Sequence, residues 1–521
     1  MAGSPLITEN YWNTFQVSKQ DIELLHNHLF ELETPLTTRE LVMVLVDRRI
    51  HAERLVTQKL RQNDGKTYLP KDEYKVGDDL VFPALDWQKG RVAELRAGVN
   101  PAAGQFDVLT VEMQSGSRMF AGRLVAHRLN EVSPSEVDDT GLEKESVFKT
   151  FGHELEEKLE SALNADEELI RIAGRWFPRA LLVTVNAGHL NLAEAVLDMA
   201  AGEPQPTGNL LKDVSLPEGV NPKLAEFSLN LALQEDERFD EVGPAGEVLW
   251  SLRRLEPEGV RQTPLQLQYD PIDFDRSILS PEMLALESQL DDELTQFEKQ
   301  THSDQVASIT ISLIYPHLRA GTLPLSARAR ALFPTAYESP RVRFTLVDGN
   351  SGAKMPAWVV RKEGYVYGLR EWYKAHQLMP GSLVAVRRGK LPGEVIVEAR
   401  SRRSTKDWVR TLMVGADGGM VFAMLKQPIT AEFNDRMAIY VPDFSLLDPL
   451  WNKKRSLVEI AVSMTHELSK LTPQGHVHAQ ELYAALNLVR RVPPAPMLTM
   501  LAGKPEFTHV GDLHFRLNEV P

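Results

Sequence analysis

Hydrophobic positions in residues 18–70 recur at helical spacing. Over residues 21–32 the apolar side chains fall three or four positions apart, which predicts an amphipathic helix. A second helix is expected to begin at Thr37, because Thr37 and Glu40 have the spacing of a capping box, and a third is expected over about residues 52–61. Three helices followed by a β element are typical of a winged-helix fold, so residues 18–70 are predicted to form a first unit of this kind.

Residues 71–130 change to a two-residue alternation between turns rich in Gly, Pro and Asn. Strands are predicted at residues 80–83, 90–95, 106–111 and 118–121. Short strands at such close spacing predict a small antiparallel barrel of the SH3-like kind. Residues 131–188 are expected to form an acidic linker and a charged helix, because residues 131–170 hold 13 Asp/Glu against 3 Lys/Arg.

The pattern of helices followed by strands returns in residues 189–255 and again in residues 451–521. Helices are predicted at about 191–201, 207–214 and 222–235, and at about 457–468, 479–488 and 495–501. Each segment ends in Phe-x-x-Val-Gly, a turn and a strand with an aromatic residue two positions before Leu. The aligned pairs are Phe239 with Phe507, Gly243 with Gly511, and Trp250 with Phe515. We interpret this as a repeat that gives a second and a third winged-helix unit, with the Phe in the core beneath the wing and the Gly at its tight turn.

Strand-like alternation dominates residues 303–412. Residues 341–347 alternate strictly, and one short helix is expected over residues 369–377. The segment is therefore predicted to be a β-barrel that holds a short helix. The flanking segments are predicted as a connecting helix (277–302) and a β-rich extension with a hairpin turn at 415–419 (413–450). The predicted fold class is α+β and multidomain.

Three stretches of the predicted barrel are specific in combination. They are Gly-Thr-Leu-Pro-Leu-Ser at 321–326, Gly-Leu-Arg-Glu-Trp-Tyr-Lys-Ala-His at 368–376, and Leu-Met-Pro-Gly-Ser-Leu-Val at 378–384. They resemble the pseudobarrel DNA-binding domain shared by plant auxin-response-type regulators and the EcoRII restriction effector domain, with Ser382 where that family often has aspartate. The resemblance implies strands around a short helix and two loops that grip the major groove, here residues 319–330 and about 358–367. The winged-helix units resemble, in pattern, those of bacterial transcription regulators and of an RNA-polymerase-associated subunit.

Composition narrows the possible chemistry and location. The 521 residues include no cysteine, which excludes disulfides, a thiol nucleophile, iron–sulfur clusters and cysteine-bound zinc, and which suits a reducing compartment. No signal peptide is recognisable, and no apolar run approaches the ~18 residues of a membrane span. We therefore expect a cytoplasmic protein without a membrane partner.

Charge is distributed unevenly along the chain. The 72 Asp/Glu and 58 Lys/Arg give a net charge of -14. Residues 301–412 hold 18 Lys/Arg against 8 Asp/Glu, a net +10, which leaves -14 minus 10, or -24, for the remainder. Because the phosphate backbone of nucleic acid attracts cations, this basic segment is the predicted contact with duplex DNA.

The predicted DNA contacts are cations on the two loops and on nearby strand ends of this segment. They are Arg319, Arg328, Arg330, Arg361, Lys362, Arg387, Arg388, Lys390, Arg402 and Arg403. Lys and Arg neutralise phosphates, and Arg can also read bases with two donors. In the first winged-helix unit, Arg54 and Lys59 lie on the expected third helix, the one that enters the major groove in such folds. A solvated helix face or solvated strand ends are the alternative interpretation of both sets.

The second winged-helix unit is a poor candidate for DNA binding. Its expected third helix offers Lys223 but also Glu226, and Glu235 to Glu237 follow as a run of three acidic residues. Phosphates would be repelled by these carboxylates. A protein partner is therefore predicted for this unit and for the acidic segments.

The sequence contains no recognisable catalytic or metal-binding constellation. His476 and His478 are two positions apart, as are His26 and His28, but no third ligand lies nearby, so a helix-start or surface role is expected. No cofactor is predicted. The sequence favours a non-enzymatic, transcription-related DNA-binding protein. The alternatives are a protein-interaction scaffold associated with RNA polymerase or a defence complex, and a component of a nuclease system.

Overall fold

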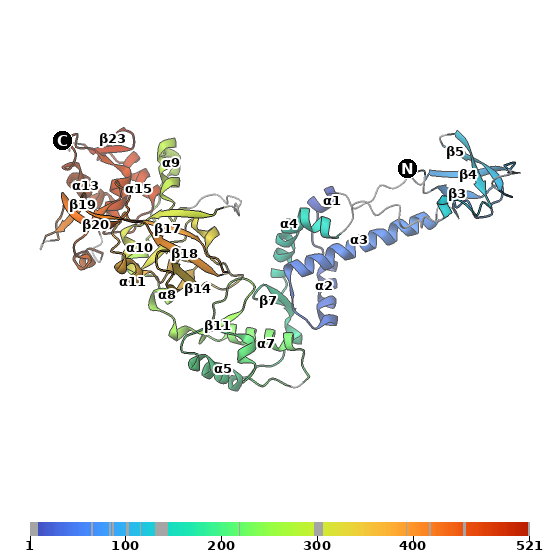
Figure 1. Ribbon diagram of the computed structural model, residues 1–521, viewed down its shortest axis with the longest axis horizontal. Helices are drawn as coiled ribbons and strands as arrows, with labels where there is room; N and C mark the ends of the chain where they lie inside the picture. Colours follow the sequence, from blue (N-terminus) through green and yellow to red (C-terminus); the bar gives the residue numbers. More distant parts are fainter. Residues whose placement is uncertain are drawn as a thin grey trace. The chain divides into compact units, whose positions relative to one another are not determined.

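The chain is a mixed α+β protein whose described strands form six sheets. The structure is a computed structural model that describes residues 9–63, 66–82, 85, 88–100, 104–114, 116–130, 144–217, 219–295, 306–391, 393–415, 418–451 and 455–518. The chain divides into two structural units, residues 1–183 with 219–227 and residues 184–218 with 228–521 (Figure 1). Among the described residues, no helix combines the length and the apolar character needed to cross a bilayer.

One arrangement occurs three times: a helix, a two-residue strand, two further helices and a β-hairpin. In the first repeat these elements are α2 (Lys19–Leu32), β1 (Leu36–Thr37), α3 (Thr38–Asn63), α4 (Lys144–Asn164), β7 (Leu169–Ile172) and β8 (Arg175–Pro178). In the second they are α5 (Ala187–Met199), β9 (Gln205–Pro206), α6 (Thr207–Leu210), α7 (Pro222–Glu235), β10 (Phe239–Glu241) and β11 (Leu249–Leu252). In the third they are α13 (Leu457–Ser469), β22 (Val477–His478), α14 (Ala479–Leu486), α15 (Pro494–Gly503), β23 (Phe507–Gly511) and β24 (His514–Leu517).

The three small sheets share one strand order and one register. In each sheet the last strand lies between the two-residue strand and the first strand of the hairpin. Trp176, Trp250 and Phe515 occupy the same position, because they pair with Leu36, Gln205 and Val477, the first residues of the two-residue strands. The hairpins that carry Phe239 and Phe507 thus share one topology, as the repeat inferred from them requires. The first unit, predicted over residues 18–70, has this topology only together with α4, β7 and β8, which lie within residues 144–178.

In two of the repeats, the tryptophan donates a hydrogen bond to the threonine that opens the helix after the two-residue strand. The indole Nε1 of Trp176 donates to Thr38 Oγ1 at 2.9 Å, and that of Trp250 donates to Thr207 Oγ1 at 3.2 Å. The third repeat places Phe515 against a helix that opens with Ala479, so donor and acceptor are absent together. A buried polar group is costly without a hydrogen-bond partner. Because the third repeat lacks both the indole donor and the hydroxyl acceptor, it leaves no unsatisfied group here.

The structure corrects the prediction for residues 37–61. The two separate helices expected there form one helix, α3, because no Gly or Pro interrupts the chain between Thr38 and Asn63. The third helix of the first repeat is instead α4, and its hairpin is β7/β8. Both follow a five-stranded sheet that interrupts the repeat.

The inserted sheet has the order β2-β3-β4-β5-β6. Its strands are β2 (Lys66–Thr67), β3 (Asp79–Phe82), β4 (Gln88–Ala97), β5 (Asp107–Met113) and β6 (Gly116–Gly122). The core contains packed aromatic rings, and the ring centres of Phe82 and Phe120 lie 4.3 Å apart. The alternation in residues 71–130 therefore predicted a real β-sheet.

The largest sheet has seven strands and curls into a half-barrel. Its strands are β12 (Ser308–Ser312), β13 (Thr322–Pro324), β14 (Arg341–Asp348), β15 (Lys354–Val360), β16 (Tyr365–Tyr367), β17 (Leu383–Arg388) and β18 (Glu394–Ala399). Their order is β12-β17-β18-β14-β15-β16-β13, with β14 and β18 parallel and the other neighbours antiparallel. Two short helices accompany it, α10 (Tyr315–Ala320) and α11 (Arg370–Ala375). The predicted short helix is confirmed as α11.

The turn between α11 and β17 depends on a glycine. Gly381 has a φ of +92°, and a Cβ at this position would lie 2.5 Å from the Cα of Ala438. A side chain would therefore collide with a neighbouring backbone that cannot rotate away.

A long hairpin follows the half-barrel. It consists of β19 (Ser401–Val414) and β20 (Met420–Ala431), and β21 (Ile439–Tyr440) pairs with β19 in parallel. The turn predicted at 415–419 is confirmed, because Val414 pairs with Met420. The remaining described helices are α1 (Glu9–Asn13), α8 (Glu258–Arg261), α9 (Pro281–Leu290) and α12 (Asp448–Trp451), of which α9 lies within the segment predicted as a connecting helix.

Candidate nucleic-acid interface

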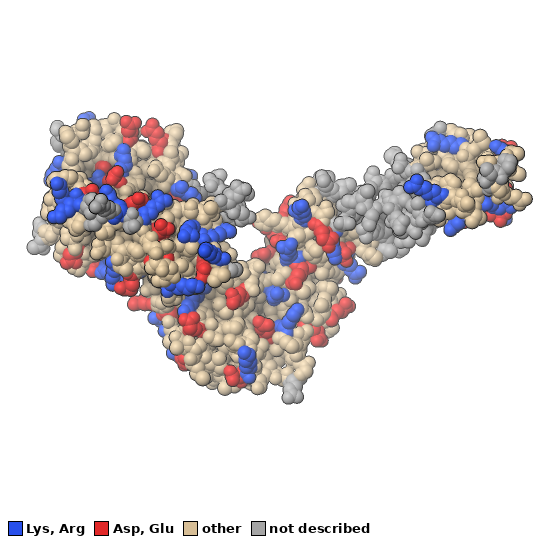
Figure 2. Space-filling model, viewed as in Figure 1, with Lys and Arg blue, Asp and Glu red and all other residues tan. Residues whose placement is uncertain are grey.

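The basic segment 301–412 is compensated by carboxylates from outside it. At least six of its arginines form such ion pairs: Arg319–Asp448, Arg328–Asp291, Arg341–Asp240, Arg343–Glu203, Arg400–Glu432 and Arg410–Glu481. Figure 2 accordingly shows Lys and Arg atoms lying among Asp and Glu atoms over the visible face. The net +10 counted along the sequence therefore overstates the positive charge available on the surface of this part of the protein.

Arg319 and Arg328 hold neighbouring helices against the half-barrel. Arg319 Nη2 lies 2.8 Å from Asp448 Oδ2 at the start of α12. Arg328 Nη2 donates to the carbonyl oxygen of Ser288 at 2.8 Å, and Arg328 Nε lies 3.1 Å from Asp291. Arg328 thus satisfies a free carbonyl at the C-terminal end of α9, a usual role for a cation at that position.

Three of the predicted cations gather around one short 3₁₀ helix, η8 (Ala329–Leu332). Arg328 precedes it, Arg330 belongs to it, and Arg388 Nη2 donates to the carbonyl oxygen of Ala331 at 2.7 Å. Arg330 Nε donates to the carbonyl oxygen of Leu325 at 3.2 Å. All three side chains are exposed, and each guanidinium has five N–H donors, so donors remain for a ligand.

Arg387 and Lys390 flank this group at the end of β17, where Arg387, the strand neighbour of Arg388, points to the opposite face of the sheet. Both are exposed, and neither has a side-chain partner among the residues that the structure describes. We call Arg328, Arg330, Arg387, Arg388 and Lys390 the η8 cation group.

Arg361 and Lys362 lie apart from the η8 cation group. They follow Val360, which pairs with Arg341 at the start of β14. Arg388 instead pairs with Val395, whose partner on β14 is Leu346, five residues and roughly 16 Å further along the strand. Arg361 Nη1 donates to the carbonyl oxygen of Ser339 at 2.6 Å, and Lys362 is exposed.

Of the other predicted cations, one is neutralised by a carboxylate, and the side chains of the rest are not described. Arg402 Nη2 lies 3.2 Å from Asp407, and its guanidinium lies 5.3 Å from the ring centre of Phe433. The side chains of Arg403, Arg54 and Lys59 lie outside the described residues.

The hairpin β19/β20 exposes a face that the sequence did not reveal as a site. Cross-strand pairing of Trp408 with Lys426 and of Lys406 with Pro428 places these four side chains on one face. The indole of Trp408 is 61% exposed, and Lys426 Nζ lies 5.3 Å from its ring centre. We call Lys406, Trp408, Lys426 and Pro428 the hairpin face.

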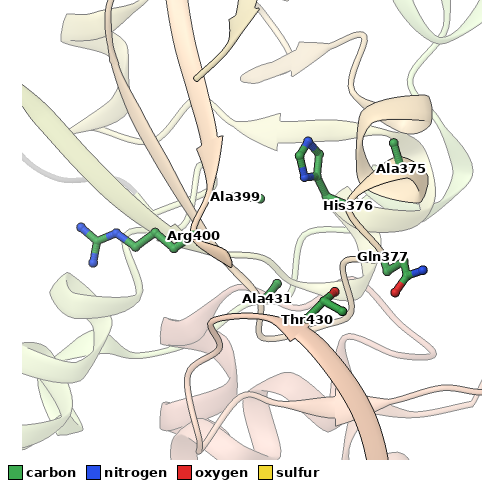
Figure 3. A pocket seen from close by; sticks show the side chains of 7 residues that line it. All are labelled: Ala375, His376, Gln377, Ala399, Arg400, Thr430 and Ala431. Carbon is green, nitrogen blue, oxygen red and sulfur yellow. The ribbon is translucent and has the colours of Figure 1, made fainter. Parts of the chain in front are cut away.

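A hollow of about 300 Å³ lies at the base of this hairpin (Figure 3). Its lining residues are Ala375, His376, Gln377, Ala399, Arg400, Thr430 and Ala431. Figure 3 shows Arg400 extending away from His376, whose Nε2 lies 3.6 Å from Asp348 Oδ2. Thr430 lies two positions beyond Pro428, so the hollow continues the hairpin face.

The helices that precede the three small hairpins do not present cationic faces. The exposed positions of α4 include Glu145, Glu154 and Glu157 beside one lysine, Lys149. Residues 494–501 of α15 are buried. Carboxylates were predicted to repel phosphates from residues 222–237, and one of them, Glu235 at the end of α7, is exposed. Base reading by these helices would require exposed donors, which these helices scarcely provide.

A chain of buried ionisable groups joins the half-barrel to the third repeat. Arg491 Nη2 lies 2.6 Å from Asp292 Oδ1 and 2.7 Å from Glu293 Oε1, and its side chain is inaccessible to solvent. Glu293 also contacts Nε2 of His317 at 3.1 Å, and Tyr483 donates its hydroxyl to Asp292. Burial favours a higher pKa for Glu293, but Arg491 and His317 outweigh it and hold the pKa well below its usual range. Such a buried network holds structure together and is closed to a ligand.

A second buried carboxyl lies where the half-barrel meets the second repeat. The side chain of Glu256 is fully buried, and Arg341 Nη1 approaches it only to 3.9 Å because it is bonded to Asp240. Burial, assisted by the charge of Asp240, raises the pKa of Glu256 to about 8. Nearby, burial also raises the pKa of Glu241 to about 8. These carboxyls are therefore largely protonated at neutral pH.

His478 has the helix-start role that the sequence predicted for it. The described residues contain no cluster of three or more His, Asp or Glu side chains arranged to hold a metal ion. His478 is the N-cap of α14, where its Nδ1 accepts from the backbone N–H of Gln480 at 3.1 Å. Burial, with Arg436 and His514 nearby, lowers the pKa of His478 to about 4. It is thus a neutral, structural histidine.

The geometry of this part of the protein offers exposed cations, an exposed indole and a hollow lined by both polar and apolar residues. Exposed cations can contact phosphates, and an exposed indole can stack on an aromatic ligand. Comparisons with models of protein families, with curated proteins and with solved structures found no match to the chain.

Proposed function

We propose that the chain is a non-enzymatic DNA-binding protein whose half-barrel contacts duplex DNA through the η8 cation group. The observation that carries the proposal is the convergence of Arg328, Arg330 and Arg388 on η8. Arg387 and Lys390, at the adjoining end of β17, are exposed and have no side-chain partner in the described part of the chain. Exposed cations that keep free donors can neutralise phosphates, which supplies most of the sequence-independent affinity for DNA. In this proposal the remaining predicted cations, above all Arg319, stabilise the fold through their ion pairs and hydrogen bonds.

In this proposal the three repeats are winged-helix units that act as scaffolds, and the five-stranded sheet is an SH3-like barrel. The topology of helix, strand, two helices and hairpin supports the first assignment. The acidic exposed side of α4 and the burial of α15 argue against insertion of these helices into a major groove.

The test is fluorescence anisotropy of the full chain with a labelled duplex of about 20 base pairs at low salt. The double variant Arg387→Ala, Lys390→Ala is expected to bind about tenfold more weakly than the unmodified chain, because two phosphate contacts are lost. Lys374→Ala is the matched control, since Lys374 is exposed on α11 but lies 2.8 Å from Glu371. Equal affinities of the double variant and the unmodified chain would contradict the proposal.

A protein-interaction scaffold is the second candidate, and one observation favours it. Leu192 and Met199 of α5 are seven positions apart, so they share a helix face, and they are 48% and 87% exposed. A partner helix or groove would bury both. Purification of the tagged chain should then retain a stoichiometric partner that is lost from Leu192→Glu, Met199→Glu but kept by Arg387→Ala, Lys390→Ala. Retention of the same proteins by both variants would count against this candidate.

A further inference from the structure

The hairpin face differs chemically from the η8 cation group because it pairs cations with an exposed aromatic ring. Trp408 leaves 61% of its surface in solvent, although a side chain of this size is usually mostly buried. Lys426 lies 5.3 Å from its ring centre and Lys406 is two positions away on the same strand face. Neither lysine has a carboxylate partner among the described residues. The face is thus cationic, aromatic and uncompensated.

The opposite face of the same hairpin shows that this arrangement is local. Val409 packs with Ile429 in a small core beneath the hairpin. Further along, on the same face as Trp408, Leu412 and Phe422 are buried against the third repeat, and Arg410 pairs with Glu481 of that repeat at 2.8 Å. The hairpin is therefore anchored at its base and near its tip, and the stretch that carries Trp408 lies between these anchors. A ring held on a fixed strand loses little freedom when it contacts a ligand.

We propose that the hairpin face binds single-stranded nucleic acid, with a base stacked on Trp408 and the backbone phosphates held by Lys406 and Lys426. This inference rests on the proposed nucleic-acid-binding function and adds a second, strand-selective surface to it. In a duplex the faces of the bases are stacked on one another, so an exposed indole can stack only on a base of a single strand. The hollow lies at the end of the face, where a further nucleotide of the strand can lie.

The charge of the hairpin segment agrees with this assignment. Residues 400–426 contain six Lys/Arg (Arg400, Arg402, Arg403, Lys406, Arg410 and Lys426) and two acidic residues, Asp407 and Asp417, which gives a net +4. Glu432 and Glu481, outside this segment, pair with Arg400 and Arg410, so +4 minus 2 leaves a net +2. Asp407 lies on the opposite face from Trp408, since successive residues of a strand alternate. Aromatic rings interleaved with cations on a strand surface are the usual platform for single strands.

The experiment measures anisotropy of the full chain with a labelled oligothymidylate and an oligouridylate, each of about 20 nucleotides, and with the corresponding duplex. Trp408→Ala is expected to weaken single-strand binding about tenfold or more, because stacking on one ring contributes about that much, and Trp408→Phe by only a few fold. Met413→Ala is the matched control, because Met413 is 43% exposed on the opposite face. Thermal unfolding of each variant establishes that the fold is retained.

The outcomes separate this inference from the proposed function. Loss of single-strand binding in Trp408→Ala, with duplex binding and Met413→Ala unchanged, supports the hairpin face as a distinct surface. Duplex binding without measurable binding of either single strand overturns the inference and leaves the proposed function standing. Equal single-strand affinities of Trp408→Ala and the unmodified chain also overturn it. The ratio between the two oligonucleotides identifies DNA or RNA as the preferred strand.

Discussion

Arg491 Nη2 lies 2.6 Å from Asp292 Oδ1, although the two residues are 199 positions apart in the chain. Both side chains are inaccessible to solvent. The pair joins the segment after α9 to the third repeat, and Glu293 extends the link to His317 at the end of the half-barrel. A continuous buried network therefore fixes the position of the third repeat on the half-barrel.

Arg491→Met should destabilise the protein by about 3–5 kcal/mol, because it leaves two carboxylates buried without their cation. The unfolding midpoint in urea, followed by tryptophan fluorescence, measures the effect. Arg490→Met is the neighbouring control: within the described residues the side chain of Arg490 donates to the carbonyl oxygen of Arg455 alone, so its loss should cost about 1 kcal/mol. Equal effects of the two substitutions would show that the buried network contributes no more than an ordinary hydrogen bond.

Stability should fall as the pH rises from about 5 to about 8. An ordinary glutamate loses its proton near pH 4.5 in the unfolded chain, whereas the pKa of Glu256 is about 8 in the folded protein. Between these values the folded state binds more protons than the unfolded state, so the free energy of unfolding decreases with pH. Glu256→Gln keeps the neutral form at every pH.

The variant should therefore match the unmodified chain near pH 5 and exceed its stability by at least about 1 kcal/mol near pH 9. Glu258→Gln, on an exposed position two residues away, should leave the pH profile unchanged. Chemical unfolding at a series of pH values provides the comparison. Parallel profiles for Glu256→Gln and the unmodified chain would contradict the assigned pKa.

Gly381→Ala should cost more stability than Gly393→Ala. Both glycines have a positive φ, +92° and +76°, so each substitution introduces backbone strain of about 1 kcal/mol. Only at Gly381 would the new Cβ also meet a backbone, that of Ala438, whereas the space around Gly393 is open. We expect a further loss of about 1–3 kcal/mol at Gly381, measured as a shift in thermal midpoint. Equal shifts would mean that the turn before β17 can relax.

Sequence patterns correctly located the helices and hairpins whose conformation is decided by residues close together in the chain. The Phe-x-x-Val-Gly stretch located the hairpins of the second and third repeats because its residues serve one turn: Phe239 and Phe507 are buried, and a Cβ on Gly243 would collide with the carbonyl oxygen of Glu247. The first repeat was misread because an inserted sheet separates α3 from α4. A helical period shows where a helix lies but not which later helix completes its core.

The candidate site was less predictable because charge acts through space. Arg319 and its partner Asp448 are 129 positions apart, so counting charges along residues 301–412 could not reveal that this arginine is neutralised. Trp408 was missed for a related reason: alternation in β19 does not show which face is covered, and that depends on Met379 and Ala438, which pack with Val409 on the opposite face. One signal was available, the tryptophan between Lys406 and Arg410 in a basic run.

The central claim is that the η8 cation group contacts duplex DNA. Its most direct test is the dependence of the duplex affinity of the full chain on salt, compared with Arg387→Ala, Lys390→Ala. Each phosphate contact contributes about 0.9 to the slope of the logarithm of affinity against the logarithm of salt concentration. The account predicts salt-sensitive binding by the unmodified chain and a slope smaller by about 2 in the double variant. Duplex binding that is absent at low salt, or a slope that the double variant leaves unchanged, would contradict it.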